Sequence, residues 1–429
     1  MIVGATRHER RMAVTQVPVA AFKNSSDTSA PAAAPAPALE PARRLASLDV
    51  FRGITMLFMA SEIMRIPSVA EKFTGSRVAQ WIAVGLDHVP WTGFVPWDLI
   101  QPSFMFMVGV ALPFSVASRR ARGEPFAAQL GHAVRRALVL ILLGVFLRSQ
   151  GRPLTYWTFE DVLTQIGLGY VFLFLLAHAT PRAQWVAAVA PLVGTWLAFA
   201  LYPLPPAGFD TALVGVPADW PHHLHGFAAH WDKNTNLANR ADQWFLNLFP
   251  RESPFVYNRG GYTTLNFVPS LATMIFGLLA GGLLRGAASD REKLRALVAY
   301  GAVGIALGAV LHFAGICPLV KRIWTPSWAI FSAGWAALFL ALYYWMIDVR
   351  GWRRWTFPFL VVGMNSIAMY VIVHVAEHYT ADALRTHLGK GTFQAFGAVY
   401  EPILLNGASL LVFWSILYWM YRRKIFIRI

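Results

Sequence analysis

Residues 264–284 read TLNFVPSLATMIFGLLAGGLL, a run without a charged side chain. A helix of about 20 predominantly apolar residues is long enough to cross the hydrocarbon core of a bilayer. Comparable apolar segments occur along the chain at roughly 45–64, 95–118, 133–148, 160–178, 183–202, 294–315, 325–347, 355–377 and 402–421. The sequence therefore predicts an all-α fold, a polytopic membrane helix bundle of about ten transmembrane helices.

The composition excludes an ordinary soluble domain. Of the 429 residues, 56% are hydrophobic and only 14% are charged, whereas soluble domains carry about 25% charged residues. The formal net charge of +15 would suit a nucleic-acid partner, but the arginines lie between the apolar segments and form no basic face. We therefore expect no nucleic-acid partner. The single cysteine, Cys317, excludes an internal disulfide and is interpreted as a packing residue.

Basic residues predict the orientation in the membrane. They concentrate in short connections, such as those at 119–122 and 135–136, and in the tail at 422–424. Short cytoplasmic connections carry the excess of Lys and Arg, so we expect both termini in the cytoplasm. The long connections at 65–94 and 203–263 then lie outside. The Ala/Pro-rich residues 1–44 are expected to form a disordered cytoplasmic tail ahead of a transmembrane domain at 45–429.

The outer connection 203–263 is rich in histidine and tryptophan, including His222, His223 and His225. This histidine cluster lacks a carboxylate at a spacing typical of zinc sites. Tryptophan favours the headgroup region of a bilayer. We interpret the segment as an interfacial loop and predict no metal.

Charged residues inside spans are costly and are candidates for function. Asp49 and Arg52 share a helix face and can pair, while Glu62 lies near the outer end of the first span. The densest polar and aromatic stretch runs from Asp87 to Asp98 and contains His88. A histidine held by a carboxylate is a plausible general base, so we predict His88 as the reactive residue.

The segment 355–377 carries Asn365, Tyr370, His374 and Glu377 at helical spacing. This spacing places the four polar groups on roughly one face of a helix. Such a stripe either lines a cavity or bonds to neighbouring helices, and the sequence leaves both interpretations open.

Several short motifs follow in order from residue 44. They are Arg44-Leu45-Ala46-Ser47-Leu48-Asp49-Val50-Phe51-Arg52-Gly53, His88-Val89-Pro90-Trp91-Thr92-Gly93, Trp97-Asp98-Leu99-Ile100-Gln101-Pro102, Gln165-Ile166-Gly167, Tyr257-Asn258-Arg259-Gly260-Gly261, Trp324-Thr325-Pro326-Ser327-Trp328 and Gly363-Met364-Asn365-Ser366-Ile367. Through this series the chain resembles the heparan-α-glucosaminide N-acetyltransferase family of transmembrane acyltransferases, which has many bacterial relatives.

The resemblance implies transfer of an acetyl group from cytosolic acetyl-CoA to an amino sugar on the periplasmic face of a bacterial inner membrane. His88 corresponds to the active-site histidine of the family, acting as general base or as acyl-accepting nucleophile. We expect Asp98 to orient it and Asn365 to stabilise the oxyanion. Acetyl-CoA is then a substrate, no cofactor is tightly bound, and membrane lipid and a second copy of the chain are the expected partners.

Two sets of binding residues complete the hypothesis. The CoA phosphates are assigned to the basic residues Arg119, Arg120, Arg135 and Arg136. Contacts to the substrates are assigned to Glu62, Asp87, Trp91, Tyr257, Asn258 and His374. The alternative function is a multi-pass transporter of a solute or lipid-linked glycan. The sequence does not choose between N- and O-transfer, between acetyl and longer acyl groups, or between the one-step and two-step routes.

Overall fold

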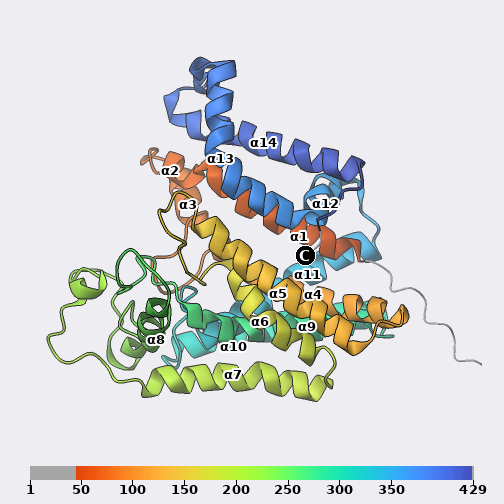
Figure 1. Cartoon of the computed structure of the whole chain (residues 1–429), viewed down its shortest axis with the longest axis horizontal. Helices are drawn as coiled ribbons and strands as arrows, with labels where there is room; N and C mark the ends of the chain where they lie inside the picture. Colours follow the sequence, from red (N-terminus) through yellow and green to blue (C-terminus); the bar gives the residue numbers. More distant parts are fainter. Residues whose placement is uncertain (1–44, 428–429) are drawn as a thin grey trace, which may run out of the picture. The chain divides into compact units, whose positions relative to one another are not determined.

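The computed structural model describes residues 45–427, so the predicted tail at 1–44 lies outside the described residues. Within this range the fold is helical, and extended pairing is limited to one isolated bridge between Thr92 and Val320. The prediction of an all-α helix bundle is confirmed for these residues (Figure 1).

Each predicted span contains a helix. The helices that correspond to the predicted spans are α1 Ala46–Ala60, α4 Ile100–Ala121, α5 Phe126–Arg148, α6 Val162–Leu176, α7 Pro181–Leu201, α9 Phe267–Arg285, α10 Asp290–Phe313, α11 Pro326–Tyr343, α12 Phe357–Met364 with α13 Ser366–Leu388, and α14 Glu401–Arg422. In the described part of the chain, 7 helices are long and apolar enough to cross a membrane, or 8 if α12 and α13 form one span. The count of ten is therefore not reached by length and composition alone, and the orientation of the termini stays a prediction.

The ninth predicted span differs from expectation because it is not one straight helix. Helices α12 and α13 meet at Asn365 with a bend of 69°. Asn365 leaves the helical conformation, with φ −131°. Its side-chain amide donates to the Ile425 carbonyl and accepts from the Ile427 amide, each at 3.0 Å. The predicted polar stripe is therefore broken, and Asn365 is separated from Tyr370 and His374 by the bend.

Close helix crossings hold the bundle together. A Cβ on Gly53 of α1 would lie 1.8 Å from the carbonyl oxygen of Phe359, and one on Gly363 would lie 1.8 Å from that of Asp49. Helices α1 and α12 can approach this closely only because glycine stands at both crossing points. Small residues at crossings are typical of packing between membrane helices.

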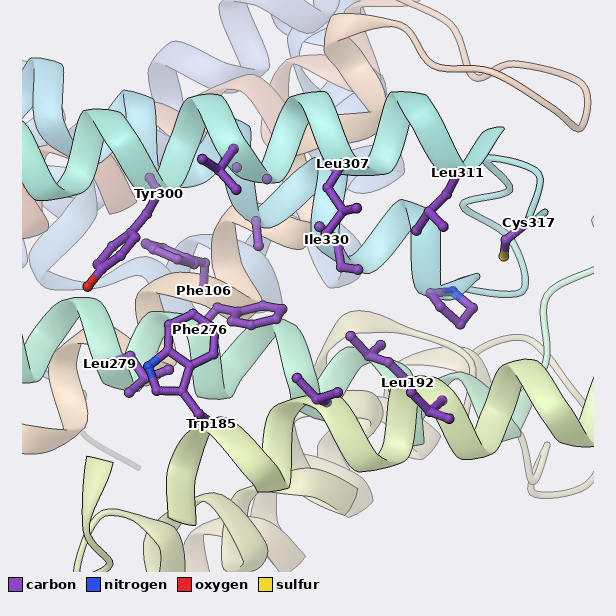
Figure 2. Close-up of a pocket in the computed structure, with 18 of the residues that line it drawn as sticks. Phe106, Trp185, Leu192, Phe276, Leu279, Tyr300, Leu307, Leu311, Cys317 and Ile330 are labelled. Carbon is purple, nitrogen blue, oxygen red and sulfur yellow. The ribbon is translucent and has the colours of Figure 1, made fainter. Parts of the chain in front are cut away.

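Helices α7, α9, α10 and α11 enclose an apolar cavity of about 460 Å³. Figure 2 shows Trp185 and Leu192 on one side of it and Tyr300, Leu307 and Leu311 on the other. Cys317 lies at one end, where its buried sulfur accepts a hydrogen bond from the Ser327 hydroxyl. This is the packing environment expected from the sequence.

The long connections fold into small helices that gather at one end of the bundle. The connection 65–94 contains α2 Ile66–Ala70 and α3 Arg77–Gly85, and 203–263 contains α8 Leu237–Phe245 (Figure 1). Loop histidines have structural partners: His223 bonds Asp232 at 2.9 Å, which raises the pKa of His223, and His230 bonds the Tyr202 carbonyl. The loops are thus built as a fixed cap at the end of the bundle where Glu62 lies.

Candidate active site

His88 and Asp98 form the centre of the candidate site. Asp98 belongs to a short 3-10 turn, Pro96–Leu99, that leads into α4. One carboxylate oxygen accepts the backbone N–H of Val95 at 3.2 Å, which fixes the side chain at the start of the helix. The other lies 2.7 Å from His88 Nδ1, and Asp98 itself is 0% exposed. The histidine is therefore anchored through one ring nitrogen to a buried carboxylate.

A third residue, Lys321, completes the group and was not predicted from the sequence. Its Nζ lies 3.2 Å from Asp98 Oδ1 and 3.1 Å from His88 Nδ1, and the residue is only 4% exposed. Burial lowers the pKa of Lys321, and the Asp98 carboxylate opposes that shift. Within the described residues, Lys321 is the only lysine or arginine that forms an ion pair with Asp98.

The tautomer of His88 follows from these distances. A ring nitrogen 2.7 Å from a carboxylate oxygen must carry the proton, since two acceptors would repel each other at that separation. Nδ1–H therefore donates to Asp98, and the lone pair of neutral His88 is on Nε2. No hydrogen bond from the described residues reaches Nε2, so this nitrogen is available to a ligand.

Three loops position these side chains. Gly93 donates to the Leu319 carbonyl at 2.9 Å, which joins the His88 loop to the connection between α10 and α11. Arg322 donates to the carbonyls of Val89 and Gly260, at 3.2 and 2.8 Å. These bonds join the loop before α9 to the His88 loop. Segments far apart in the sequence thereby converge on the His88–Asp98 pair.

His88 faces a polar cavity of about 880 Å³. The charged side chains that line it are Glu62, Arg65, Glu71, Asp87, Arg148, Glu160, Asp161, Lys321 and Glu377. Six of these are carboxylates and three are basic. Gln101, Tyr262, Tyr370 and His374 contribute further polar groups. The cavity can therefore hold a hydrophilic molecule the size of a sugar, with an excess of acidic groups around it.

Glu160 and Asp161 form the wall contributed by the connection before α6. Glu160 accepts from the Thr158 hydroxyl at 3.0 Å and from the Asn258 amide at 2.8 Å. Asp161 caps α6 by accepting the N–H groups of Leu163 and Thr164. Helix capping explains why Asp161 is held there, while Glu160 is positioned by side-chain donors.

Four of the predicted site residues line the cavity: Glu62, Asp87, His88 and His374. Asp98 lies behind His88. The other predicted substrate contacts have different positions. Trp91 is fully buried and donates to the Trp231 carbonyl at 3.1 Å, so it packs the loops instead of lining the cavity. Asn258 lies behind Glu160, and Tyr257 packs against Gly215 beside a separate pocket.

The remaining predicted residues lie at the opposite end of the bundle. Gly363, two residues before Asn365, meets Asp49 near the start of α1, roughly 20 Å of helical rise from Glu62. Asn365 is therefore not brought to His88, and its amide is already bonded to the C-terminal segment. These bonds occupy the Asn365 amide, and its predicted contact with an oxyanion at His88 stays a prediction.

The four arginines assigned to CoA also lie far from His88. Arg119 follows Asp98 by roughly 30 Å of helical rise along α4. Arg119 pairs with Glu124 at 2.8 Å, and Arg136 stacks on Tyr170. Arg120 and Arg135 are exposed. They share the α4–α5 end of the bundle, away from the long loops (Figure 1).

Fold and site together define a polytopic membrane protein with a histidine–carboxylate–lysine group facing a polar cavity. The chain is similar to heparan-alpha-glucosaminide N-acetyltransferase of Mus musculus, with 25% identity over 79% of this chain, and to that of Homo sapiens, with 26% identity over 90%. It spans 54% and 60% of the length of these relatives. No family model matches the chain. The resemblance expected from the motifs is thus confirmed by similarity over most of the chain.

Proposed function

We propose that the protein is a transmembrane acyltransferase that moves an acetyl group from acetyl-CoA to a sugar bound in the cavity beside His88. The observation that carries the proposal is the 2.7 Å contact between His88 Nδ1 and the buried Asp98, which leaves Nε2 free at a polar cavity. Similarity to relatives named as N-acetyltransferases supports the same reaction class.

The chemistry can follow either of two balanced routes. In the first, Nε2 accepts a proton from the acceptor while the acceptor attacks the thioester carbonyl and CoA thiolate leaves. In the second, Nε2 attacks the carbonyl and CoA thiolate leaves; the acyl-imidazole then passes its acyl group to the acceptor, whose proton goes to the thiolate or to a cavity carboxylate. In both, Asp98 holds the ring and stabilises the positive charge that develops on it. Lys321 offsets the charge of Asp98 through the ion pair between them.

The charge of the cavity favours an amine over an uncharged hydroxyl as the acceptor. Its six carboxylates outnumber its three basic side chains, and a low-dielectric wall strengthens their attraction for a cation. A protonated amino sugar matches that excess. It must lose a proton before attacking the thioester, and carboxylates such as Asp87 or Glu160 can accept it.

The donor is assigned to the other end of the bundle. Phosphates of acetyl-CoA would bind the exposed Arg120 and Arg135, where guanidinium groups suit phosphate oxygens. The pantetheine arm would pass between the helices and present the thioester at His88. With both termini in the cytoplasm, the donor enters from the cytoplasm and the acceptor binds on the periplasmic side of the inner membrane.

The test uses purified protein in nanodiscs with labelled acetyl-CoA and a panel of amino and neutral sugars. We expect labelled sugar and free CoA with the wild type and with His387→Ala, which changes an exposed histidine far along α13. His88→Ala should lose turnover. If wild type binds no acetyl-CoA and transfers nothing, the acyltransferase proposal fails and transport becomes the leading function.

A further inference from the structure

A second polar pocket adjoins the cavity and is basic. It has a volume of about 340 Å³ and lies between the loop after α5 and the segment 251–259. Three arginines line it, Arg152, Arg251 and Arg259, together with a single carboxylate, Glu252. The excess of positive charge is the reverse of that in the cavity.

Two of the three arginines, Arg152 and Arg251, lie against aromatic rings instead of carboxylates. Arg152 lies over Tyr156 at 4.3 Å, and Arg251 lies 5.4 Å from the rings of both Tyr156 and Phe255. Arg251 also donates to the carbonyls of Leu246 and Trp157, which fixes its position. Across residues 45–427, none of the three arginines forms an ion pair. Stacked guanidinium groups keep their N–H edges free for oxygen ligands.

The location of these arginines is contrary to the rule that Lys and Arg concentrate in the cytoplasmic connections of a membrane protein. The pocket lies between the α5–α6 connection and the long connection 203–263, on the side of the bundle predicted to face outward, where basic residues are disfavoured. The orientation of the chain in the membrane therefore does not explain why three arginines lie there. Planar, paired guanidinium groups are the usual donors to phosphate, sulfate and carboxylate groups.

Pocket and cavity share their walls. Asn258 lies between Tyr257 and Arg259, which line the pocket, and its amide donates to Glu160 of the cavity. Arg148, which lines the cavity, is the last residue of α5, and Arg152 follows it through a turn in which its backbone N–H donates to the Ser149 carbonyl. A ligand that fills the cavity and extends past Glu160 would meet the pocket.

We propose that this pocket binds an anionic oxygen group, a sulfate, phosphate or carboxylate, adjacent to the acceptor. The position of the acceptor rests on the proposed function, whereas binding of the anion does not. The anionic group comes either from an acidic substituent of the acceptor itself or from a lipid headgroup. Guanidinium groups of Arg152 and Arg259 donate to its oxygens, and Arg251 stabilises the loop between them.

The experiment measures ligand binding, so its result does not depend on whether the protein transfers an acetyl group. Wild-type protein in nanodiscs of neutral phosphatidylcholine is titrated with glucosamine and with glucosamine 6-sulfate. The test variant is Arg152→Ala/Arg259→Ala, which spares the structural bonds of Arg251. The matched control is Arg240→Ala, an arginine of the same outer connection that bonds Gln243 outside the pocket. A parallel arm uses nanodiscs containing phosphatidylglycerol, with thermal stability as the readout.

We expect wild type and the control to bind the sulfated sugar roughly tenfold more tightly than the neutral one, and the double variant to lose that preference. If the source is a lipid headgroup, phosphatidylglycerol instead stabilises wild type and not the double variant. Equal behaviour of the double variant and wild type in both arms would overturn the proposal. A protein that shows the preference but transfers no acetyl group would refute the proposed function alone.

Discussion

Lys321→Met removes the ammonium group beside the His88–Asp98 pair and should change both stability and pH dependence. The lysine Nζ lies 3.1 Å from His88 Nδ1. Two unit charges at that distance interact by about 1.3 kcal/mol even at the dielectric constant of water, and by more in a less polar medium. Removing the ammonium group removes this repulsion from the positive charge that develops on the ring of His88 during the reaction.

The acidic limb of the pH–rate profile should therefore move to higher pH in the variant. Loss of the buried partner also leaves Asp98 uncompensated, which costs about 3–5 kcal/mol of stability. The double variant Lys321→Met/Asp98→Asn removes both charges and should recover most of that stability. The assay is acetyl transfer by purified protein from about pH 5 to pH 9, with thermal unfolding in parallel. An unmoved limb with a normal rate would refute the coupling of Lys321 to His88.

Three further predictions concern single residues. Asp98→Asn should lower kcat by about 10²–10⁴ with little change in the KM for acetyl-CoA, because the ring of His88 loses its anionic partner; steady-state kinetics measures both. Burial raises the pKa of Asp242 to about 7, so the folded state binds a proton that the unfolded state releases, and stability should fall as pH rises from about 4 to 7. Asp242→Asn should flatten that fall in thermal unfolding, and an unchanged slope would contradict the assignment. Gly53→Ala should cost about 1–3 kcal/mol or more, since its Cβ meets the Phe359 carbonyl, whereas Gly75→Ala, with open space around it, should be neutral.

The sequence predicted the helices well because apolar length is a local property. The segment 264–284, for example, is helical over Thr264–Arg285. The break in the ninth span was not predicted, because it depends on a tertiary partner. Asn365 leaves the helix where its amide bonds Ile425 and Ile427, about 60 residues further along the chain. Apolar periodicity carries no information about such a partner.

The site was predicted only in part for the same reason. His88 and Asp98 are ten residues apart in one polar stretch, and their pairing could be inferred. Lys321 is 223 residues from Asp98, so no local pattern relates them. One signal was present: Lys321 and Arg322 are basic residues in a connection that the predicted orientation places outside, where basic residues are disfavoured.

Motifs identified important residues without identifying their roles. Trp91 belongs to a motif that suggested substrate binding, but it is fully buried and joins two loops through Trp231. Asn258 likewise holds Glu160 instead of lining the cavity. A motif records which residues are needed, and only the packing shows whether a residue touches a ligand or supports one that does.

The net charge of the chain does not predict the charge of its individual pockets. The chain as a whole has a net charge of +15, yet the cavity beside His88 has twice as many carboxylates as basic groups. The pocket next to it has three arginines and one carboxylate. The Asn258–Glu160 hydrogen bond lies between the two regions. Under the proposed function, the loops would determine which acceptor binds, because they place acidic and basic groups in neighbouring sites. A ligand that is cationic at its reacting end and anionic beyond it would fit both sites at once.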